Sequence, residues 1–334
     1  MSLHTFLTLL GFGLTTGAAY GLFALGYSLV YGVLGTMNLA HGDVLMFASF
    51  VALGASEAGA PPALAVLAGM ATGAVAGAIV DQVAYRPLRH TGDSLAPLVA
   101  ALGAALILRN LAASAFGVDD RGFPELLGGT HVHLGAAGIP TAALISVPAC
   151  LLVALGARRF LDRTRYGAMV QAVSQDLTAA RLVGIPVWAA VLAVYALSGV
   201  VAALGGILYA STFSSLTLSL GWTATVVAFT AAVLGGTTSL PGAVVGGLVL
   251  GVANSYLAYL LPSGYRDAIV FFVLAAVLVV RPPASLAPRR RARSRAPLAW
   301  GRRALVRSSS TSSSTIQAPM DSRRLEADDD EENR

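Results

Sequence analysis

Long apolar stretches separated by short polar segments run along most of the chain. A helix that crosses the core of a bilayer needs about 20 mostly apolar residues. Stretches of that kind lie at 5–33, 44–57, 62–81, 94–117, 138–157, 188–213, 222–236, 241–261 and 266–281. Some are too short or too long for one simple span, so we expect about eight to ten transmembrane helices and take nine as the working number.

The region between Arg181 and Arg266 is the strongest sign of a membrane protein. Its 84 residues contain no Asp, Glu, Arg or His, a run that a soluble fold would not tolerate. Backbone polar groups in lipid must be hydrogen-bonded within the spanning segment, which favours helices. The predicted fold class is therefore all-α: a polytopic membrane protein with broken helices and an internal repeat.

The placement of arginine predicts the orientation in the membrane. The loops at 82–93 and 158–187 and the tail from Arg281 carry Arg, whereas the loop at 118–137 is mainly acidic. Basic residues accumulate on the cytoplasmic side. We therefore expect the first three segments and the C-terminus to be cytoplasmic and 118–137 to be external. Nine spans would also place the N-terminus outside.

Composition narrows the classes of function. Of 334 residues, 56% are hydrophobic and only 12% are charged, against roughly 25% charged in an average soluble domain. This excludes an ordinary soluble enzyme, a disordered chain and a nucleic-acid binder. The single cysteine, Cys150, excludes a disulfide framework. His131 and His133 alternate in the acidic loop, but no cysteine or carboxylate cluster completes a metal site around them. We predict neither metal nor cofactor.

The chain carries no machinery for ATP hydrolysis of its own. All 22 basic residues are Arg, so the phosphate-binding loop G-x-x-x-x-G-K-[ST], which needs a lysine, is absent. No nucleophile–base pair stands out either. We therefore predict a non-catalytic membrane subunit or transporter.

The C-terminal segment differs from the rest. We predict a transmembrane domain over 1–283 and a disordered tail over 284–334, which is Arg-rich, then Ser-rich, then acidic. Such low-complexity sequence cannot bury a core. Residues 282–334 hold 11 Arg and 7 acidic residues, which is +4 of the net +5. The basic part is expected to bind anionic lipid headgroups, with a dispensable extension as the alternative.

Two polar interruptions match at an offset of 200 residues. Segments 33–44 and 233–244 share Val, Leu, Gly, Gly and Val without a gap. Paired interruptions in the two halves of a transporter point to its pathway. The candidate pathway residues are Asn38, His41, Asp43, Thr237, Thr238, Ser239 and Pro241. The alternative is a satisfied helix junction in which Asp43 caps the next helix.

Glycines recur four residues apart in several apolar stretches. The sets are Gly13/Gly17/Gly21, Gly69/Gly73/Gly77, Gly242/Gly246 and Gly247/Gly251. Small residues at this spacing let helices in lipid approach closely. We expect tight packing within the chain, with a dimerisation face as the alternative.

The loop at 158–187 is the most informative polar segment. Met169, Val170, Val173 and Leu177 have helical spacing, and Gly184 and Pro186 follow a second short run. This predicts a short helix, a turn and another short helix on the cytoplasmic side. The segment either lies on the membrane surface or docks a partner.

Five segments carry a resemblance to a known family. They are YGLFALGYSLVYGVLGTMNLAHGDVLMFAS at 20–49, VAYRPLR at 83–89, RYGAMVQAVSQDLTAARLVGIPV at 165–187, AAVLGGTTSLPGAVVGGLVLG at 231–251 and SGYRDAIVFFVLAAVLVVRP at 263–282. In these segments the chain resembles the permease subunits of branched-chain amino acid ABC importers, LivH-like, over about residues 5–283.

The resemblance implies a role for the polar loop. In such importers a coupling helix with an Ala-Ala-x-x-x-Gly pattern sits in a groove of the ATP-hydrolysing subunit. The implied ATPase-contact residues here are Arg165, Tyr166, Gly167, Gln175, Asp176, Ala179, Ala180, Arg181 and Gly184. Many relatives have Glu before the Ala pair, where this chain has Thr178.

The resemblance also implies partners and a function. The partners are a second related permease, two cytoplasmic ATPase subunits and an extracytoplasmic solute-binding protein. The function is movement of branched-chain or other hydrophobic amino acids across the inner membrane, driven by ATP that the partners hydrolyse. The alternatives are urea or amides as the solute, an ion-coupled secondary transporter that uses Asp43 and Asp81, and a passive channel.

Overall fold

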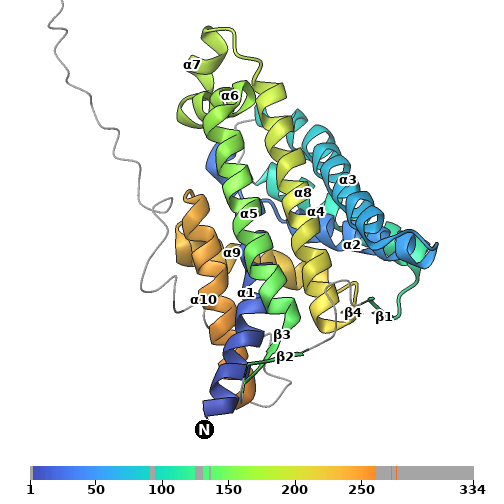
Figure 1. The fold of residues 1–334 in the computed structure, drawn as a ribbon. Helices are drawn as coiled ribbons and strands as arrows, with labels where there is room; N and C mark the ends of the chain where they lie inside the picture. The colour runs from blue at the N-terminus through green and yellow to red at the C-terminus, as the bar shows by residue number, and fades with distance from the viewer. Residues whose placement is uncertain are drawn as a thin grey trace, which may run out of the picture. The chain divides into compact units, whose positions relative to one another are not determined.

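The computed structural model describes residues 3–90, 95–124, 131–134 and 137–260, together with positions 272 and 276. The chain divides into two units, 1–287 and 288–334. The predicted span at 266–281, apart from those two positions, and the predicted tail lie outside the described residues. The described residues of the first unit are almost entirely helical (Figure 1). The all-α, polytopic prediction is confirmed.

The helices follow the apolar stretches of the sequence. They are α1 (Leu3–Leu34), α2 (His41–Glu57), α3 (Pro62–Val80), α4 (Ala96–Phe116), α5 (Thr141–Arg163), α6 (Arg165–Gln175), α7 (Leu177–Leu182), α8 (Val187–Phe213), α9 (Leu220–Gly235) and α10 (Leu240–Leu260). A π-helical turn, η1 (Asp81–Tyr85), and a 3-10 turn, η2 (Pro87–His90), follow α3.

Six of the described helices are long and apolar enough to cross a bilayer: α1, α3 with η1, α4, α5, α8 and α10. The helix α9 is apolar but has only 16 residues, and α2 has 17. Two boundaries differ from the sequence prediction. The helix α2 begins at His41 rather than near residue 44, and α5 continues to Arg163 through residues expected to lie in a loop.

Short strands connect the loops at one end of the helices. Strand β1 (Arg121–Gly122) pairs antiparallel with β4 (Ser215–Leu216), and β2 (His131–Leu134) pairs with β3 (Ala137–Pro140). The β1–β4 pair joins the segment after α4 to the segment after α8. The start of the expected span at 138–157 is therefore a strand, because the helix begins only at Thr141.

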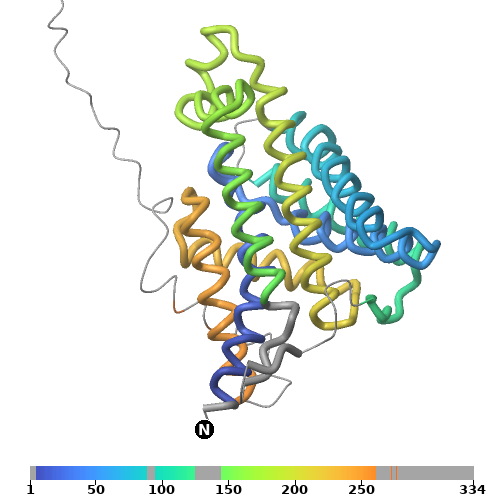
Figure 2. The backbone as a smooth tube through the Cα atoms, in the orientation of Figure 1, coloured from blue at the N-terminus to red at the C-terminus, as the bar shows by residue number. Residues whose placement is uncertain are grey.

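Close helix packing explains the glycine spacing. A Cβ atom at Gly13 or Gly17 would lie 2.8 or 2.9 Å from the Cα of Val252 or Leu248, respectively, so α1 and α10 touch along their backbones. Gly73 and Gly77 of α3 likewise lie against the backbone of α8, at Gly199 and Tyr195. Figure 2 traces these two pairs side by side. The prediction of tight packing within the chain is confirmed.

The knob, which we define as α6 and α7, lies beyond one end of α5 and α8 (Figure 1). The guanidinium of Arg86, after η1, lies 6.0 Å from the ring centroid of Trp188 at the start of α8. The loop after α3 is therefore at the knob end. The exposed Arg121–Glu57 pair, 3.3 Å apart, marks the opposite end. This separation agrees with the predicted placement of the two Arg-bearing loops on one side.

Candidate translocation and coupling sites

The first predicted interruption, segment 33–44, contains the turn at residues 35–40 that joins α1 to α2. Gly35, at φ +67°, follows the last residue of α1. The Oδ1 of the buried Asn38 accepts a hydrogen bond from the backbone N–H of Ala40 (3.1 Å). The Tyr85 hydroxyl donates to the Met37 carbonyl (3.1 Å) and lies 3.3 Å from Asn38 Oδ1. A side chain from η1 thus holds this interruption in place.

His41 fixes the start of α2 against α1. Its ring is buried, and its Nε2 donates to the Phe23 carbonyl at 3.0 Å. The ring also lies so close to Gly26 that a Cβ there would be 2.9 Å from its Cε1. Phe23 and Gly26 belong to the candidate membrane span of α1. The start of α2 at His41 therefore lies beside this span and not in a loop beyond its end.

Asp43 forms an ion pair with Arg109 of α4. Nη2 and Nε of Arg109 lie 3.0 and 3.2 Å from Asp43 Oδ1. The Asp43 side chain is 2% exposed and that of Arg109 is 34% exposed. Asp43 lies in the first turn of α2, where the helix dipole favours a negative charge. The N-cap residue of α2 is Ala40, and Asp43 lies three residues further along the helix.

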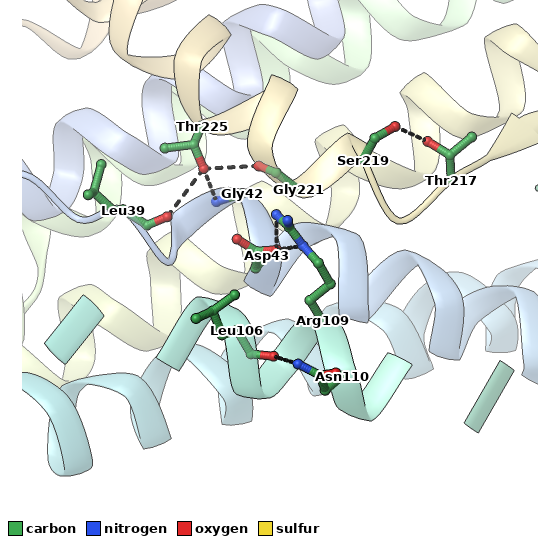
Figure 3. A network of polar contacts seen from close by, with 10 residues as sticks. All are labelled: Leu39, Gly42, Asp43, Leu106, Arg109, Asn110, Thr217, Ser219, Gly221 and Thr225. Atoms are coloured by element: carbon green, nitrogen blue, oxygen red, sulfur yellow. Dashed lines mark hydrogen bonds and ion pairs between the residues drawn. The ribbon is translucent and has the colours of Figure 1, made fainter. Parts of the chain in front are cut away.

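The first turn of α2 packs against α9. The backbone N–H of Gly42 donates to Thr225 Oγ1 at 3.0 Å, and the same hydroxyl lies 3.0 Å from the Gly221 carbonyl (Figure 3). A Cβ atom at Gly42 would overlap the Gly221 carbonyl. Asp43 and Arg109 point toward each other beside this contact (Figure 3). The site therefore joins α2, α4 and α9.

The second predicted interruption, segment 233–244, contains a tight turn at residues 236–239 between α9 and α10. Gly236, at φ +98°, follows α9. The Ser239 hydroxyl accepts a hydrogen bond from the Gly242 backbone N–H at 3.2 Å. Gly235 and Gly242 face each other so closely that neither could carry a Cβ atom without overlap. Thr238, Ser239 and Pro241 are exposed, and Thr237 is half-buried.

The knob has the predicted helix–turn–helix form. Thr164 caps α6 by accepting from Gly167 N (3.0 Å). Asp176 caps α7 by accepting from the backbone N–H groups of Thr178 and Ala179 (2.8 and 2.9 Å). Gly184, at φ +80°, ends this helical segment. Pro186 follows and is the N-cap residue of α8.

The predicted coupling residues separate into two groups. Gly167 and Ala180 are buried, and Gly167 packs against the backbone of Leu161 at the end of α5. The others are exposed: Arg165, Tyr166, Gln175, Asp176, Ala179, Arg181 and Gly184. Leu182 and Val183 are 84% and 75% exposed. The knob therefore presents an apolar surface flanked by a basic residue.

The sequence prediction missed the partners of the buried polar groups. Arg109 is the only charged residue in α4, and an ionisable residue within a span is by itself a functional candidate. That signal was in the sequence. Tyr85, Gly221 and Thr225 carry no comparable signal, because their roles depend on which helices meet. Within the described part of the chain, no three His, Cys, Asp or Glu residues gather as a metal site would require.

Comparisons with known proteins agree with the resemblance. A family described as "Branched-chain amino acid transport system / permease component" matches residues 9–278. The chain is similar to the high-affinity branched-chain amino acid transport system permease proteins BraD of Pseudomonas aeruginosa and LivH of Escherichia coli K12. It is 34% and 33% identical to them, respectively, over 283 residues, which is 81% of this chain and 92% of each relative.

Among solved structures, the chain is similar to a chain of PsaBC from Streptococcus pneumoniae in complex with Fab. The TM-score is 0.44 and the sequence identity is 14%, over 81% of this chain and 89% of that one.

Proposed function

Since the chain belongs to the family of branched-chain amino acid transport permease components, we propose that it is the membrane-spanning subunit of an ATP-driven importer for branched-chain or other hydrophobic amino acids. A permease component of this kind is a non-catalytic, multi-pass membrane protein. The match over 92% of the length of BraD and LivH supports carrying this role over to the chain.

The proposed assembly has four kinds of component. This chain pairs with a second, related permease, two ATPase subunits bind on the cytoplasmic side, and a solute-binding protein delivers the amino acid from outside. In this proposal the knob and the C-terminus lie on the cytoplasmic side of the membrane. ATP binding by the partners then shifts the spans between outward-facing and inward-facing states, which requires only that ATP favour one of two conformations.

The observation that carries the coupling proposal is the exposure of the knob. The helix α7 is capped by Asp176 and ended by Gly184, so its short length is fixed. Its exposed residues Ala179 and Arg181, with the adjoining Leu182, are not covered by other described parts of the chain. An exposed apolar surface on a short, capped helix fits a docking element for a second protein.

The ion pair supports ATP-driven over ion-coupled transport. A carboxylate that couples to protons or sodium must be able to release and take up its ion during the cycle. Asp43 is one of the two carboxylates considered for ion coupling, and its Oδ1 forms an ion pair with Arg109 Nη2 at 3.0 Å. We therefore assign Asp43 to the structure and lining of the pathway, along with Asn38 and His41. The exposed residues of the second interruption, 237–241, are assigned to the same pathway.

Reconstitution tests the function. The chain, its second permease and the ATPases are placed in proteoliposomes with the loaded binding protein, and uptake of radiolabelled leucine, acetamide and urea is measured. We expect leucine uptake only with ATP. Uptake by the chain alone under an ion gradient would overturn the ATP-driven assignment. Uptake of urea or acetamide in place of leucine would overturn the amino-acid assignment.

A pair of matched variants tests the knob. Ala179→Arg places a large charge on the exposed face of α7, and Ala58→Arg places the same charge on an exposed alanine at the opposite end of the molecule. We expect the first variant to lose co-purification of the ATPases and the second to retain it. Normal ATPase binding by Ala179→Arg would remove α7 from the docking surface.

A further inference from the structure

The π-helical turn η1 contacts both the first interruption and the helix α8. Its last residue, Tyr85, is buried, and the Tyr85 hydroxyl donates to the Met37 carbonyl at 3.1 Å. The same hydroxyl lies 3.3 Å from Asn38 Oδ1. The Tyr85 ring also packs against the ring of Tyr195 of α8, with centroids 5.5 Å apart. Turns of the π type are frequent at functional sites, so the two contacts of Tyr85 call for an explanation.

Close contacts join the end of α3 and η1 to the first half of α8. A Cβ atom at Gly77 of α3 would overlap the Tyr195 carbonyl, so the two backbones touch there. The Arg86 guanidinium, directly after η1, lies over the ring of Trp188, the second residue of α8. Because closely packed elements transmit displacement rather than absorb it, η1 is expected to move together with this part of α8.

The helix α8 begins directly after the knob. Pro186 is its N-cap residue, and both α6 and α7 contact α8. The ATPase subunits are proposed to bind the knob, so a movement that they impose on it acts on the first turns of α8. The turn η1 therefore lies between the helix that the ATPases would move and the interruption that is assigned to the pathway.

From these contacts we propose that Tyr85 is a positioning residue for transport, whose hydroxyl transmits the movement of α8 to the first interruption. The inference rests on the proposed function, because it takes the knob as the ATPase-binding element. When the first half of α8 shifts, η1 shifts with it, and the Tyr85 hydroxyl pulls on the Met37 carbonyl and the Asn38 side chain. Asn38 Oδ1 accepts from the Ala40 N–H at the start of α2, so the movement reaches α2.

A different contact ties α8 to α1 within the helices. The Ser198 hydroxyl donates to the Gly26 carbonyl at 2.8 Å. Both residues lie inside candidate membrane spans, and the bond does not involve residues 35–40. Tyr85, by contrast, bonds to the turn itself. Removing its hydroxyl should therefore leave the helix packing in place and change only how the turn follows α8.

Two tyrosine variants test the proposal in the reconstituted complex with loaded binding protein. Tyr85→Phe removes the hydroxyl and keeps the ring beside Tyr195. Tyr256→Phe is the matched control, because the Tyr256 hydroxyl also donates to a carbonyl of another helix, that of Phe6 at 3.0 Å, and its ring packs against the Phe6 ring. That contact lies near the start of α1, whereas residues 35–40 follow its end.

ATP hydrolysis and uptake of radiolabelled leucine are measured in the same vesicles. Coupling between two sites typically changes an equilibrium by a factor of about 5–150. We expect Tyr85→Phe to lower the leucine moved per ATP hydrolysed at least about fivefold, while the ATPases still co-purify and hydrolyse ATP. Tyr256→Phe should leave this ratio unchanged.

A labelling experiment measures the movement of the turn directly. The single cysteine, Cys150, is buried, so Met37→Cys at an exposed position supplies an accessible thiol and keeps the backbone carbonyl. Maleimide labelling of this chain is timed in the assembled complex, without nucleotide and with a non-hydrolysable ATP analogue. We expect the analogue to change the labelling rate when Tyr85 is present and to have little effect when Tyr85→Phe is added.

Three results would overturn the role of Tyr85. They are a proportional fall of ATP hydrolysis and uptake in Tyr85→Phe or a failure of that variant to assemble, an equal loss of the ratio in Tyr256→Phe, and a nucleotide response at position 37 that does not depend on Tyr85. Failure of the proposed function looks different, because the wild-type complex itself would then move no leucine with ATP. In that case the labelling comparison alone supports or overturns the inference.

Discussion

The two polar interruptions of this chain have similar sequences but different surroundings. Each follows a helix and contains a glycine with positive φ, Gly35 in one and Gly236 in the other. The first leads into buried polar residues that are held by contacts from distant elements, including Thr225 and Arg109. The second is exposed and held by local contacts such as Ser239 to Gly242. Similar sequence therefore does not imply similar energetics.

The difference follows from burial. A buried charge or N–H group must find a partner, because leaving it unsatisfied is costly in a low-dielectric medium. An exposed serine or threonine can bond to water. Mutations in the first interruption should therefore be far more damaging than equivalent ones in the second, and four predictions test this difference in order of decreasing effect.

The largest effect is expected at the ion pair. Asp43→Asn leaves the guanidinium of Arg109 without its counter-charge, and breaking a buried pair in this way costs about 3 kcal/mol in the free energy of unfolding. Denaturant unfolding in detergent micelles measures it. Arg109→Gln serves as the partner mutation, and the double variant should lose less than the sum of the two. Additive losses would show that the two residues act independently.

The next effect concerns the contact of α2 with α9. Gly42→Ala would force a Cβ atom into the Gly221 carbonyl, so we expect a loss of about 2 kcal/mol, typical of overpacking. Gly32→Ala on α1 is the control. Its Cβ meets no atom within 4 Å, and alanine favours a helix over glycine, so this variant should be neutral or slightly more stable. Equal losses in both would argue against the close contact.

A smaller loss of stability is expected when the Thr225 hydroxyl, which accepts a hydrogen bond from the Gly42 N–H, is removed. Thr225→Val keeps the shape but leaves the Gly42 N–H without this acceptor, at a cost of about 1–2 kcal/mol. Thr238→Val makes the same change at an exposed position in the second interruption, where a surface substitution should cost less than about 0.5 kcal/mol. Thermal unfolding of both variants gives the comparison.

The smallest effect is expected at the start of α10. Ser239→Ala removes the hydroxyl that accepts from Gly242 N, a loss of about 1 kcal/mol at most for an exposed helix cap. Ser239→Asp should retain the stability, because a carboxylate can accept the same hydrogen bond. A loss in Ser239→Ala as large as that in Asp43→Asn would contradict the difference between the two interruptions.

The sequence predicted the features that depend on local pattern. The apolar stretches predicted most of the helices, the four-residue glycine spacing predicted close packing between helices, and Gly184 indicated the end of α7.

The sequence could not predict the features that depend on which helices meet. The pairing of Asp43 with Arg109 spans 66 residues, and that of Gly42 with Thr225 spans 183. The exposed surface of the knob followed from its polar composition, but the burial of Gly167 and Ala180 did not.

The π-helical turn that ends α3 has a consequence for how the chain tolerates changes in length. The backbone N–H of Arg86 bonds to the Asp81 carbonyl, five residues back, at 2.8 Å. A π-type turn therefore holds one residue more than an ordinary α-turn. A deletion within this turn can therefore be absorbed by a return to α geometry, because the extra residue is taken up inside the turn. A deletion in the regular part of α3 would instead rotate the residues after it by about 100° and carry the Tyr85 hydroxyl away from Asn38. The contact between η1 and the first interruption thus tolerates the loss of one residue in η1 better than the same loss in α3.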